Sequence, residues 1–472
     1  MKRYDYTIVG GGAAGFSAAI KLSELTEGKA SIALVNYGKL GGTCVNVGCV
    51  PSKYLIEAAK LYHEGRESRF PGIGVSTRLD FKALMNDLRR FVAQLRSEKY
   101  EQVLQHYGNV EVFHGKASFT SSGALQIAAD GQQLEVGAEK YLIATGSRPV
   151  PPPIEGINKA GYLDSDRIWS LEEQPESMLV IGAGAIGLEI GQAMLRLGTK
   201  IHLVEVMDRI LPGAEPEISD TLYRVLKQEG MDIHLKTRIA RIATDNGRKR
   251  VSILTHEGEK SIIVDEVLAA AGRRANTEYL NLDKVGVELD GRGFVKVDDG
   301  MRTSNPRIYA AGDVISKKLM LETLSAREGV VAAINMTGGH AAIDYSAVPV
   351  VTFTEPQAAF VGMSEQEVSE KYGACSCRVL KMEDVPKARI TRNTEGLIKI
   401  VIHPYTGKIA GVHALSANAA EYIIAAAYML KTGQRVEDVI DTIHVFPSFA
   451  EAMKLAATAF TRPVEFMPCC ME

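Results

Sequence analysis

The six cysteines of this chain occur as three close pairs. The pairs are Cys44 with Cys49, Cys375 with Cys377, and the adjacent Cys469 and Cys470. Two neighbouring thiols can form a disulfide, bind a soft metal ion or exchange a ligand. In a reducing compartment such pairs are more often catalytic or metal-binding than structural. We therefore take the three pairs as the candidate reactive groups.

The spacing of the first pair favours a redox-active disulfide. Cys49 follows Cys44 by five positions, and residues at that separation on a helical turn with glycine and valine between them can close a small disulfide. The alternative is a buried thiol pair or half of a zinc site. A zinc site is disfavoured because no second Cys or His pair at ligand spacing lies nearby.

The segment before this pair has the order strand, glycine turn, helix. Its parts are the β-rich run 4–9, the turn Gly10-Gly11-Gly12-Ala13-Ala14-Gly15, and the apolar run 16–25. In a dinucleotide fingerprint Gly10 permits the tight turn, Gly12 lets the backbone approach a pyrophosphate, and Gly15 lets helix and strand pack closely. We therefore expect the chain to begin with a dinucleotide site.

A second copy of the same pattern lies further along the chain. It consists of the strand 177–181, the turn Gly182-Ala183-Gly184-Ala185-Ile186-Gly187, and a helix that ends at Leu197. One such glycine run could be an accidental turn, whereas two complete copies make chance improbable. The sequence therefore predicts two dinucleotides, one in each unit.

The residue at the end of the next strand should hold the ribose of each nucleotide. In the first unit this residue is Asn36, whose amide binds a hydroxyl less strongly than a carboxylate would. In the second unit it is Glu205, which favours NADH because a carboxylate there would repel the 2′-phosphate of NADPH. Arg209 is close enough in sequence to leave the nucleotide preference open.

Length and charge set the class of protein. A chain of 472 residues with 46% hydrophobic content suggests roughly three domains of ~150 residues. The net charge of −3 gives no electrostatic footprint for nucleic acid or an anionic membrane, so neither partner is expected. The basic N-terminus lacks the pattern of a signal peptide, and we expect a cytoplasmic protein.

These motifs resemble the pyridine nucleotide–disulfide oxidoreductases, the family of glutathione reductase and lipoamide dehydrogenase, over nearly the whole chain. The segments 144–149 (Ala-Thr-Gly-Ser-Arg-Pro) and 308–313 (Ile-Tyr-Ala-Ala-Gly-Asp) support the resemblance. It implies FAD in the first unit and NADPH or NADH in the second. It also implies that Cys49 faces the flavin ring, that Cys44 meets the substrate, and that Asp313 binds the ribityl chain.

The resemblance and the glycine motifs together predict the cofactor-binding residues. They are Gly10, Gly12, Ala14, Gly15, Asn36, Gly42, Thr43, Lys53, Thr145, Gly146, Gly182, Gly184, Ile186, Gly187, Glu205, Gly272, Gly312 and Asp313. Lys53 and Glu189 resemble the ion pair that the family places beside the flavin. A lysine there favours the reduced, anionic ring, and a carboxylate partner favours the charged lysine. A surface lysine and an ordinary helix glutamate are the alternative.

One family motif is altered. Relatives that reduce organic disulfides carry a His-Pro-Thr segment whose histidine, donated across the dimer, protonates the leaving thiolate. The matching stretch here begins Phe446-Pro447-Ser448, so the base is missing and thiol–disulfide exchange should be poor. His444 could be taken for a displaced base, but we expect an ordinary packed histidine.

A substrate that needs thiolates but no proton shuttle is a soft metal ion. Cys469 and Cys470 could not pair without strain, so a thiol pair that captures an ion and passes it on is the better interpretation. These features resemble the mercuric reductases of the family. The resemblance implies that Hg²⁺ passes from Cys469 and Cys470 of the partner subunit to Cys44 and Cys49 and is reduced there to Hg⁰.

The expected fold is α/β, with two Rossmann-like units and a C-terminal α+β dimerisation domain. The predicted parts are 1–150 and 273–343 for FAD, 151–272 for NAD(P)H, and 344–472 for the homodimer interface and tail. The stiff run 148–153 marks the first boundary.

Three points stay open. We expect Cys375 and Cys377 to lie in a solvated loop rather than to bind a metal. Ser448 stands where mercuric reductases commonly have tyrosine. The alternatives to a mercuric reductase are a disulfide reductase of the same family, such as dihydrolipoyl dehydrogenase, and a flavin-binding regulatory protein without turnover.

Overall fold

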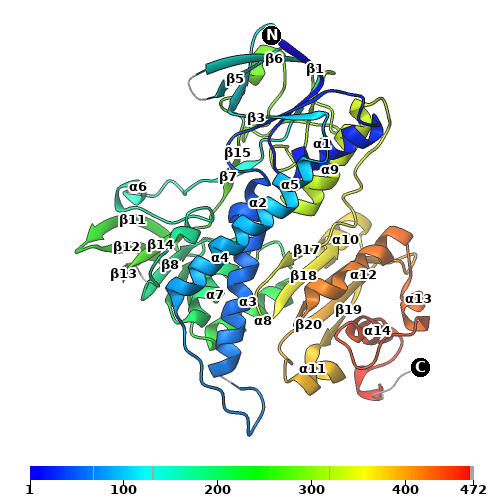
Figure 1. The fold of residues 1–472 in the computed structure, drawn as a ribbon. Coiled ribbons are helices and arrows are strands. Elements are labelled where there is room, and N and C mark those ends of the chain that lie inside the picture. Colours follow the sequence, from blue (N-terminus) through cyan, green and yellow to red (C-terminus); the bar gives the residue numbers. More distant parts are fainter. Residues whose placement is uncertain (67, 130–131, 257, 318, 468–472) are drawn as a thin grey trace.

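Three main β-sheets, each covered by helices, make up the described part of the protein (Figure 1). The structure is a computed structural model and describes residues 1–66, 68–129, 132–256, 258–317 and 319–467. No helix among these residues is long and apolar enough to cross a membrane. The predicted fold class is confirmed, since two α/β units are followed by an α+β unit.

The first sheet is parallel at its centre and joins distant parts of the chain. In spatial order its strands are β3 (Val110–His114), β2 (Ile32–Asn36), β1 (Lys2–Val9), β6 (Gln132–Ile143), β5 (Leu125–Ala129) and β4 (Lys116–Phe119), and β16 (Ile308–Ala310) also pairs with β6. Helices α1 (Ala13–Leu25) and α9 (Glu322–Met336) pack against each other beside it. The first unit is therefore discontinuous in sequence.

The second sheet is parallel throughout. Its strands in order are β10 (Asp232–His234), β9 (Lys200–Val204), β8 (Ser177–Ile181) and β14 (Glu266–Ala269). The unit also contains the helices α7 (Ala185–Leu197) and α8 (Pro216–Gln228). A separate antiparallel sheet is formed by β11 (Arg238–Asp245), β12 (Arg248–Thr255) and β13 (Gly258–Val264). The run 148–153 is not wholly a linker, because β7 (Ser147–Pro149) pairs with β15 (Arg273–Ala275).

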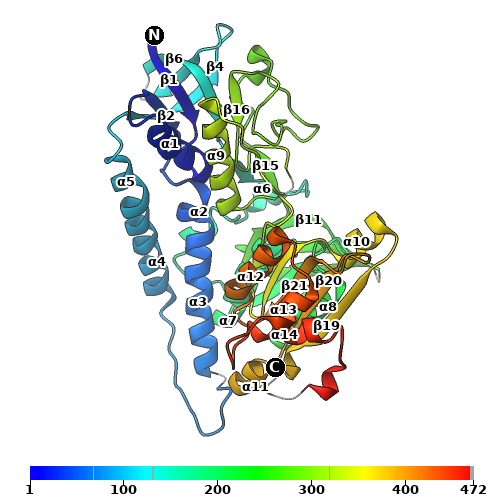
Figure 2. The same ribbon diagram turned by 90° about the vertical axis from the view of Figure 1, so that its right-hand side faces the viewer.

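The third sheet is antiparallel. Its strands in order are β17 (Val350–Thr352), β18 (Gln357–Gly362), β21 (Ile409–Ser416), β20 (Leu397–Ile402) and β19 (Ser376–Lys381). The helices of this unit are α10 (Glu365–Tyr372), α11 (Pro386–Thr391), α12 (Ala419–Thr432), α13 (Val436–Asp441) and α14 (Glu451–Thr458). Helices α12 and α14 cover one face, in front of β20 and β21 in Figure 2. The other face meets α8 of the second unit.

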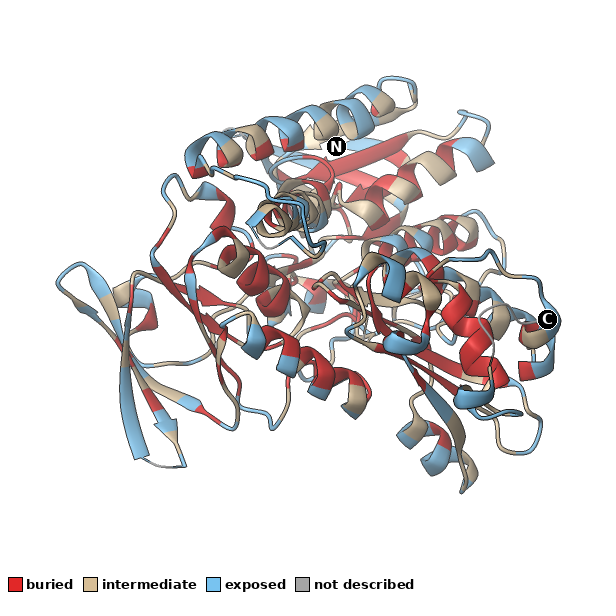
Figure 3. Ribbon diagram, turned by 90° about the horizontal axis from the view of Figure 1, so that it is seen from below, coloured by how far each residue is buried: buried red, intermediate tan, exposed pale blue. Residues whose placement is uncertain are grey.

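The helices that carry the first cysteine pair bind the three units together. Helix α2 (Gly42–Val47) leads into α3 (Cys49–Arg66), which lies beside α4 (Phe81–Arg96) (Figures 1 and 2). One buried cluster contains side chains of α3, α4, α7 and the third sheet, and in Figure 3 the buried segments lie mainly in the interior, with exposed residues around the outside. The cysteine helices are thus fixed by a shared core, while the predicted domain boundaries stay predictions.

Candidate active site

A cavity of about 970 Å³ lies where the glycine turn after β1 meets α2 and α3. Cofactor and ligand sites commonly occupy about 300–1,000 Å³. Its wall includes both cysteines of the first pair, the glycine turn, and residues of α7 and α9. The elements of the first sheet therefore bring the predicted flavin residues and the redox cysteines to one place.

The two glycine turns have the same geometry. A Cβ atom at Gly15 would lie 1.8 Å from the carbonyl oxygen of Gly10, and one at Gly187 would lie 2.1 Å from that of Gly182. Each helix begins after a glycine N-cap without a side-chain cap, so its first N–H groups are available to an anion. Both turns therefore fit the pyrophosphate of a dinucleotide.

The residues at the strand ends support the glycine turns directly. The Oδ1 atom of Asn36 accepts a hydrogen bond from the Gly11 N–H at 3.0 Å. The carboxylate of Glu205 accepts from the N–H groups of Ala183 at 2.7 Å and Met207 at 2.9 Å. Because a carboxylate oxygen accepts more than one hydrogen bond, Glu205 keeps capacity for a ribose hydroxyl.

Cys44 and Cys49 lie on two consecutive helices that meet at Gly48. The Cys44 thiol lies within hydrogen-bonding reach of both the Cys49 sulfur and the carboxylate of Glu322. The hydrogen bond from Cys44 and the charge of Lys53 lower the pKa of Cys49, although burial opposes them. The same hydrogen bond, with burial and Glu322, raises the pKa of Cys44. These contacts therefore favour the thiolate at Cys49 and the protonated thiol at Cys44.

The sequence analysis missed Glu322. This residue opens α9, and its two oxygens reach Cys44 and, at 3.3 Å, the hydroxyl group of Tyr100. Burial, with the charge of Glu322, raises the pKa of Tyr100, so Tyr100 stays a hydrogen-bond donor to the carboxylate. Glu322 reaches Cys44 because α9 packs closely against α1. A Cβ atom at Gly329 of α9 would lie 2.0 Å from the carbonyl oxygen of Ala14 in α1. No local motif reveals this contact.

Lys53 and Glu189 form an ion pair at 2.7 Å on the wall of the cavity. The Glu189 side chain is 7% exposed, and its other oxygen accepts from the N–H of Phe353 at 2.8 Å. The Lys53 ammonium also lies 4.4 Å from the centre of the Phe353 ring. This pair therefore joins α3, α7 and the third unit beside the cysteines.

The remaining predicted cofactor residues divide into two groups. Those on the cavity wall are Gly10, Gly12, Ala14, Asn36, Gly42, Thr43, Thr145, Gly146, Ile186, Gly312 and Asp313. Those outside it are Gly15, which lies beneath the first turn, and Gly182, Gly184, Gly187, Glu205 and Gly272, which belong to the second unit. The Asp313 carboxylate accepts from the Ser147 hydroxyl at 2.9 Å.

The structure describes only some of the C-terminal residues to which the sequence assigned a role. Cys469 and Cys470 lie outside the described residues. Among the described residues that line the cavity there is no histidine. His444 is part-exposed, with its Nδ1 3.0 Å from the Thr442 carbonyl oxygen. Ser448 accepts a hydrogen bond from the Glu451 N–H at 3.2 Å and so helps to begin α14.

The prediction for Cys375 and Cys377 is wrong in part. Cys377 lies in β19, opposite Val401 of β20, and both cysteines are half-buried. Cys375 lies in the short loop between α10 and β19, as predicted, whereas Cys377 belongs to the edge strand.

Comparisons with known proteins agree with this architecture. A model of the pyridine nucleotide-disulphide oxidoreductases matches residues 4–329, and a model of their dimerisation domain matches residues 348–457. The mercuric reductase of Streptomyces lividans is 39% identical over 99% of this chain and 98% of its own length. The mercuric reductase of Lysinibacillus sphaericus is 36% identical over 99% of this chain and 84% of its own length.

Two solved structures have the same fold over nearly the whole chain. The HOCl-induced flavoprotein disulfide reductase RclA from Escherichia coli, solved as a Cu(II) complex, has 27% identity and a TM-score of 0.86, covering 97% of this chain and 99% of that chain. LpdA from Mycobacterium tuberculosis has 25% identity and a TM-score of 0.88, covering 98% and 100%. The glycine turns, the paired cysteines and the full-length matches together place this chain in the pyridine nucleotide-disulphide oxidoreductase family.

Proposed function

We propose that the protein is a mercuric reductase, which reduces Hg²⁺ to Hg⁰ with electrons from NAD(P)H. One observation carries the proposal: the cysteine pair, in which the pKa of Cys49 is lowered, lies beside the Lys53–Glu189 ion pair, while Phe446 stands where disulfide-reducing relatives have histidine. Similarity to curated mercuric reductases over 99% of the chain supports it. A soft cation needs thiolates and an electron donor, and this site offers both.

The cofactors of the family, FAD and NAD(P)H, fit the residues of the two units. The first glycine turn, Thr145 and Asp313 would hold FAD, and the second turn with Glu205 would hold the nicotinamide nucleotide. Bound FAD supplies the two electrons, which it receives from NAD(P)H. Lys53, fixed by Glu189, places a positive charge beside that site and beside Cys49.

The two cysteines enter the reaction in different protonation states. Cys49 binds Hg²⁺ directly as a thiolate, whereas Cys44 must lose its proton as the second sulfur–mercury bond forms. The Glu322 carboxylate lies in hydrogen-bonding contact with that thiol and accepts the proton. Two electrons then convert the bound Hg²⁺ to Hg⁰, both sulfur–mercury bonds break, and Cys44 recovers its proton from Glu322.

The match to the dimerisation domain supports a homodimer. Large apolar side chains are exposed on α12 and in the segment before α14, and they fit such an interface: Ile424, Tyr428, Ile443, Val445 and Phe446. We propose that Cys469 and Cys470 of the partner subunit deliver Hg²⁺ to Cys44, and that small thiols carry the ion in solution.

A disulfide reductase is the second candidate. Glu322 favours it, because a carboxylate beside the substrate-facing thiol could carry the proton that thiol–disulfide exchange requires. The similarity to the flavoprotein disulfide reductase RclA is compatible with it. The two candidates make opposite predictions about substrates.

NAD(P)H oxidation with alternative acceptors separates them. We expect Hg²⁺ with an excess of small thiol to stimulate oxidation, and lipoamide, glutathione disulfide and thioredoxin to give only the background rate. The variant with Cys44→Ser and Cys49→Ser is the control, because it should lose the response to Hg²⁺. Rapid turnover of lipoamide with no response to Hg²⁺ would reject the mercury proposal in favour of the second candidate.

A further inference from the structure

The second cysteine pair lies in a cluster of its own, on the third unit. The sulfur atoms of Cys375 and Cys377 and a carboxylate oxygen of Glu365 all lie within 4.8 Å of one another. Cys375 lies in the short loop directly before β19, and Cys377 is the second residue of that strand. Cys377 is opposite Val401, and the same face of the sheet also carries Lys399. Two thiols and a carboxylate thus converge on one point.

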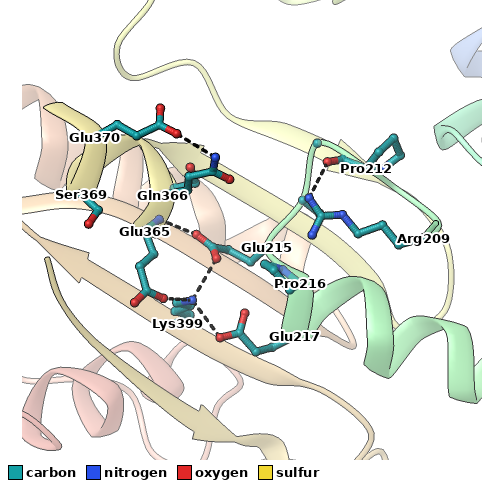
Figure 4. A pocket seen from close by; sticks show the side chains of 13 residues that line it. Arg209, Pro212, Glu215, Pro216, Glu217, Glu365, Gln366, Ser369, Glu370 and Lys399 are labelled. Carbon is teal, nitrogen blue, oxygen red and sulfur yellow. Dashed lines mark hydrogen bonds and ion pairs between the residues drawn. The ribbon is translucent and has the colours of Figure 1, made fainter. Parts of the chain in front are cut away.

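The cluster has an excess of negative charge. The Lys399 ammonium, whose side chain is 1% exposed, contacts Glu365 at 2.6 Å, Glu215 at 2.9 Å and Glu217 at 2.9 Å (Figure 4). Burial alone would lower the pKa of Lys399, but these three hydrogen bonds outweigh it and raise the pKa. Three carboxylates around one ammonium leave two negative charges without a cation, so the surroundings of the thiols favour a divalent cation.

Two of the three carboxylates, Glu217 and Glu365, are accessible from solvent, whereas Glu215 is buried. A cavity of about 570 Å³ between α8 and α10 is lined by Glu215, Glu217, Glu365 and Lys399. The Glu365 side chain is 44% exposed, whereas both cysteines are half-buried. A cation can therefore reach Glu365 first, and the sulfurs within 4.8 Å of its carboxylate are partly shielded from water.

We propose that Cys375, Cys377 and Glu365 form a second binding site for a soft divalent cation, such as Hg²⁺ or Cd²⁺. Thiolate sulfur selects such ions over Mg²⁺ or Ca²⁺. Each thiol releases its proton to solvent as its sulfur–metal bond forms, and no electrons are transferred. Glu365 exchanges Lys399 for the cation, and Glu215 and Glu217 keep the ammonium paired.

This site is independent of the proposed function, because it binds without reduction. If the protein is a mercuric reductase, the site holds the substrate ion on the third unit, on residues that do not line the flavin cavity. A disulfide between the two cysteines is a poor alternative, because residues only two positions apart in the sequence close a small, strained ring.

Metal retention by a variant that keeps only Cys375 and Cys377 tests the proposal. In the full-length protein with FAD, Cys44, Cys49, Cys469 and Cys470 are changed to serine, which leaves two of the six cysteines. Equilibrium dialysis with Cd²⁺ alone, then with Hg²⁺ and competing cysteine, should retain one ion per chain, with thiolate-to-metal absorption in the near ultraviolet. Adding Cys375→Ser and Cys377→Ser should abolish retention. No retention, or two ions per chain on separate sulfurs, would overturn the proposal.

Two carboxylates of the same helix provide a matched control. Glu365 belongs to the cluster, whereas Glu370 also lines the cavity but accepts a hydrogen bond from Gln366 at 2.8 Å. We expect Glu365→Gln to weaken Cd²⁺ binding by about 10-fold or more, because the amide lacks the negative charge of the carboxylate, and Glu370→Gln to leave it unchanged. Equal weakening in both variants would mean a general charge effect and would contradict the proposed ligand.

A second measurement covers the case in which the four-serine variant does not fold. Changing only Cys375 and Cys377 to serine in the otherwise unaltered chain should lower the retained Cd²⁺ by one ion per chain, with FAD content unchanged. An unchanged ion count would overturn the proposal. Failure of the mercuric reductase proposal would leave this count as predicted, because the measurement involves no electron transfer.

Discussion

Cys44 and Cys49 lie beside the ammonium of Lys53, whereas Cys375 and Cys377 lie beside a lysine already surrounded by three carboxylates. In the first pair the pKa of Cys49 is lowered and that of Cys44 is raised. In the second pair burial raises both, that of Cys377 to about 12. The same residue type is thus prepared for turnover at one site and only for binding at the other, because the neighbouring charges differ.

Loss of Cys49 should have the largest effect on turnover. We expect Cys49→Ala to lower Hg²⁺-dependent NAD(P)H oxidation about 10³-fold or more, because it removes the thiolate that binds the ion. The matched change is Cys375→Ala with Cys377→Ala, which should alter the rate by less than about twofold if the second site takes no part in reduction. Similar losses of turnover in both variants would contradict the conclusion that only the first pair takes part in reduction.

Alkylation of the reduced protein should separate the pairs by their ionisation. At pH 7 we expect iodoacetamide to modify Cys49 at least about 100-fold faster than Cys377, since only the thiolate reacts. Because the pKa of Cys377 is raised to about 12, its rate should climb with pH throughout the accessible range. The Cys49 rate should level off above its lowered pKa. Peptide mass spectrometry gives both rates, and equal rates at pH 7 would contradict the account.

Glu322→Gln tests the proton acceptor at the first pair. The amide cannot take the proton of Cys44, so we expect turnover with Hg²⁺ to fall roughly 10-fold near neutral pH, at the low end for general base catalysis. The loss should shrink at higher pH, where hydroxide removes the proton. Tyr100→Phe should have a smaller effect, because Tyr100 only hydrogen-bonds the same carboxylate. A pH-independent loss in Glu322→Gln would mean a structural role.

Lys53→Met should give the smallest change, a shift in the Cys49 titration. Removing the charge should raise the Cys49 pKa, seen as thiolate absorbance appearing at higher pH. Lys60 lies two turns further along α3 and pairs with Glu355 at 2.7 Å. Lys60→Met is therefore a control that should leave the titration unchanged.

The predictable parts of this protein are those encoded by local spacing. Both glycine turns follow a strand and open a helix, and the predicted end of the second helix at Leu197 is confirmed. Neighbouring residues decide such turns, because only glycine avoids the carbonyl oxygens that a Cβ atom would strike. The resemblance added Lys53 and Glu189, which are distant in sequence and meet at 2.7 Å.

The remaining features depend on packing between distant segments. Glu322 reaches Cys44 only because α9 packs closely on α1, and no spacing rule connects positions so far apart. The surroundings of Cys377 come from three segments, since Glu215, Glu365 and Lys399 belong to different elements. Sequence reasoning could see the Cys-x-Cys spacing but not the carboxylates beside it.

In the proposed reaction, electrons from NAD(P)H reach Hg²⁺ held by Cys44 and Cys49. NAD(P)H absorbance and Hg⁰ vapour should therefore be followed simultaneously under anaerobic conditions. We expect one atom of Hg⁰ for each NAD(P)H oxidised, and none from the variant with Cys44→Ser and Cys49→Ser. NAD(P)H oxidation without Hg⁰, or Hg⁰ formation that survives loss of both cysteines, would contradict the proposed reaction.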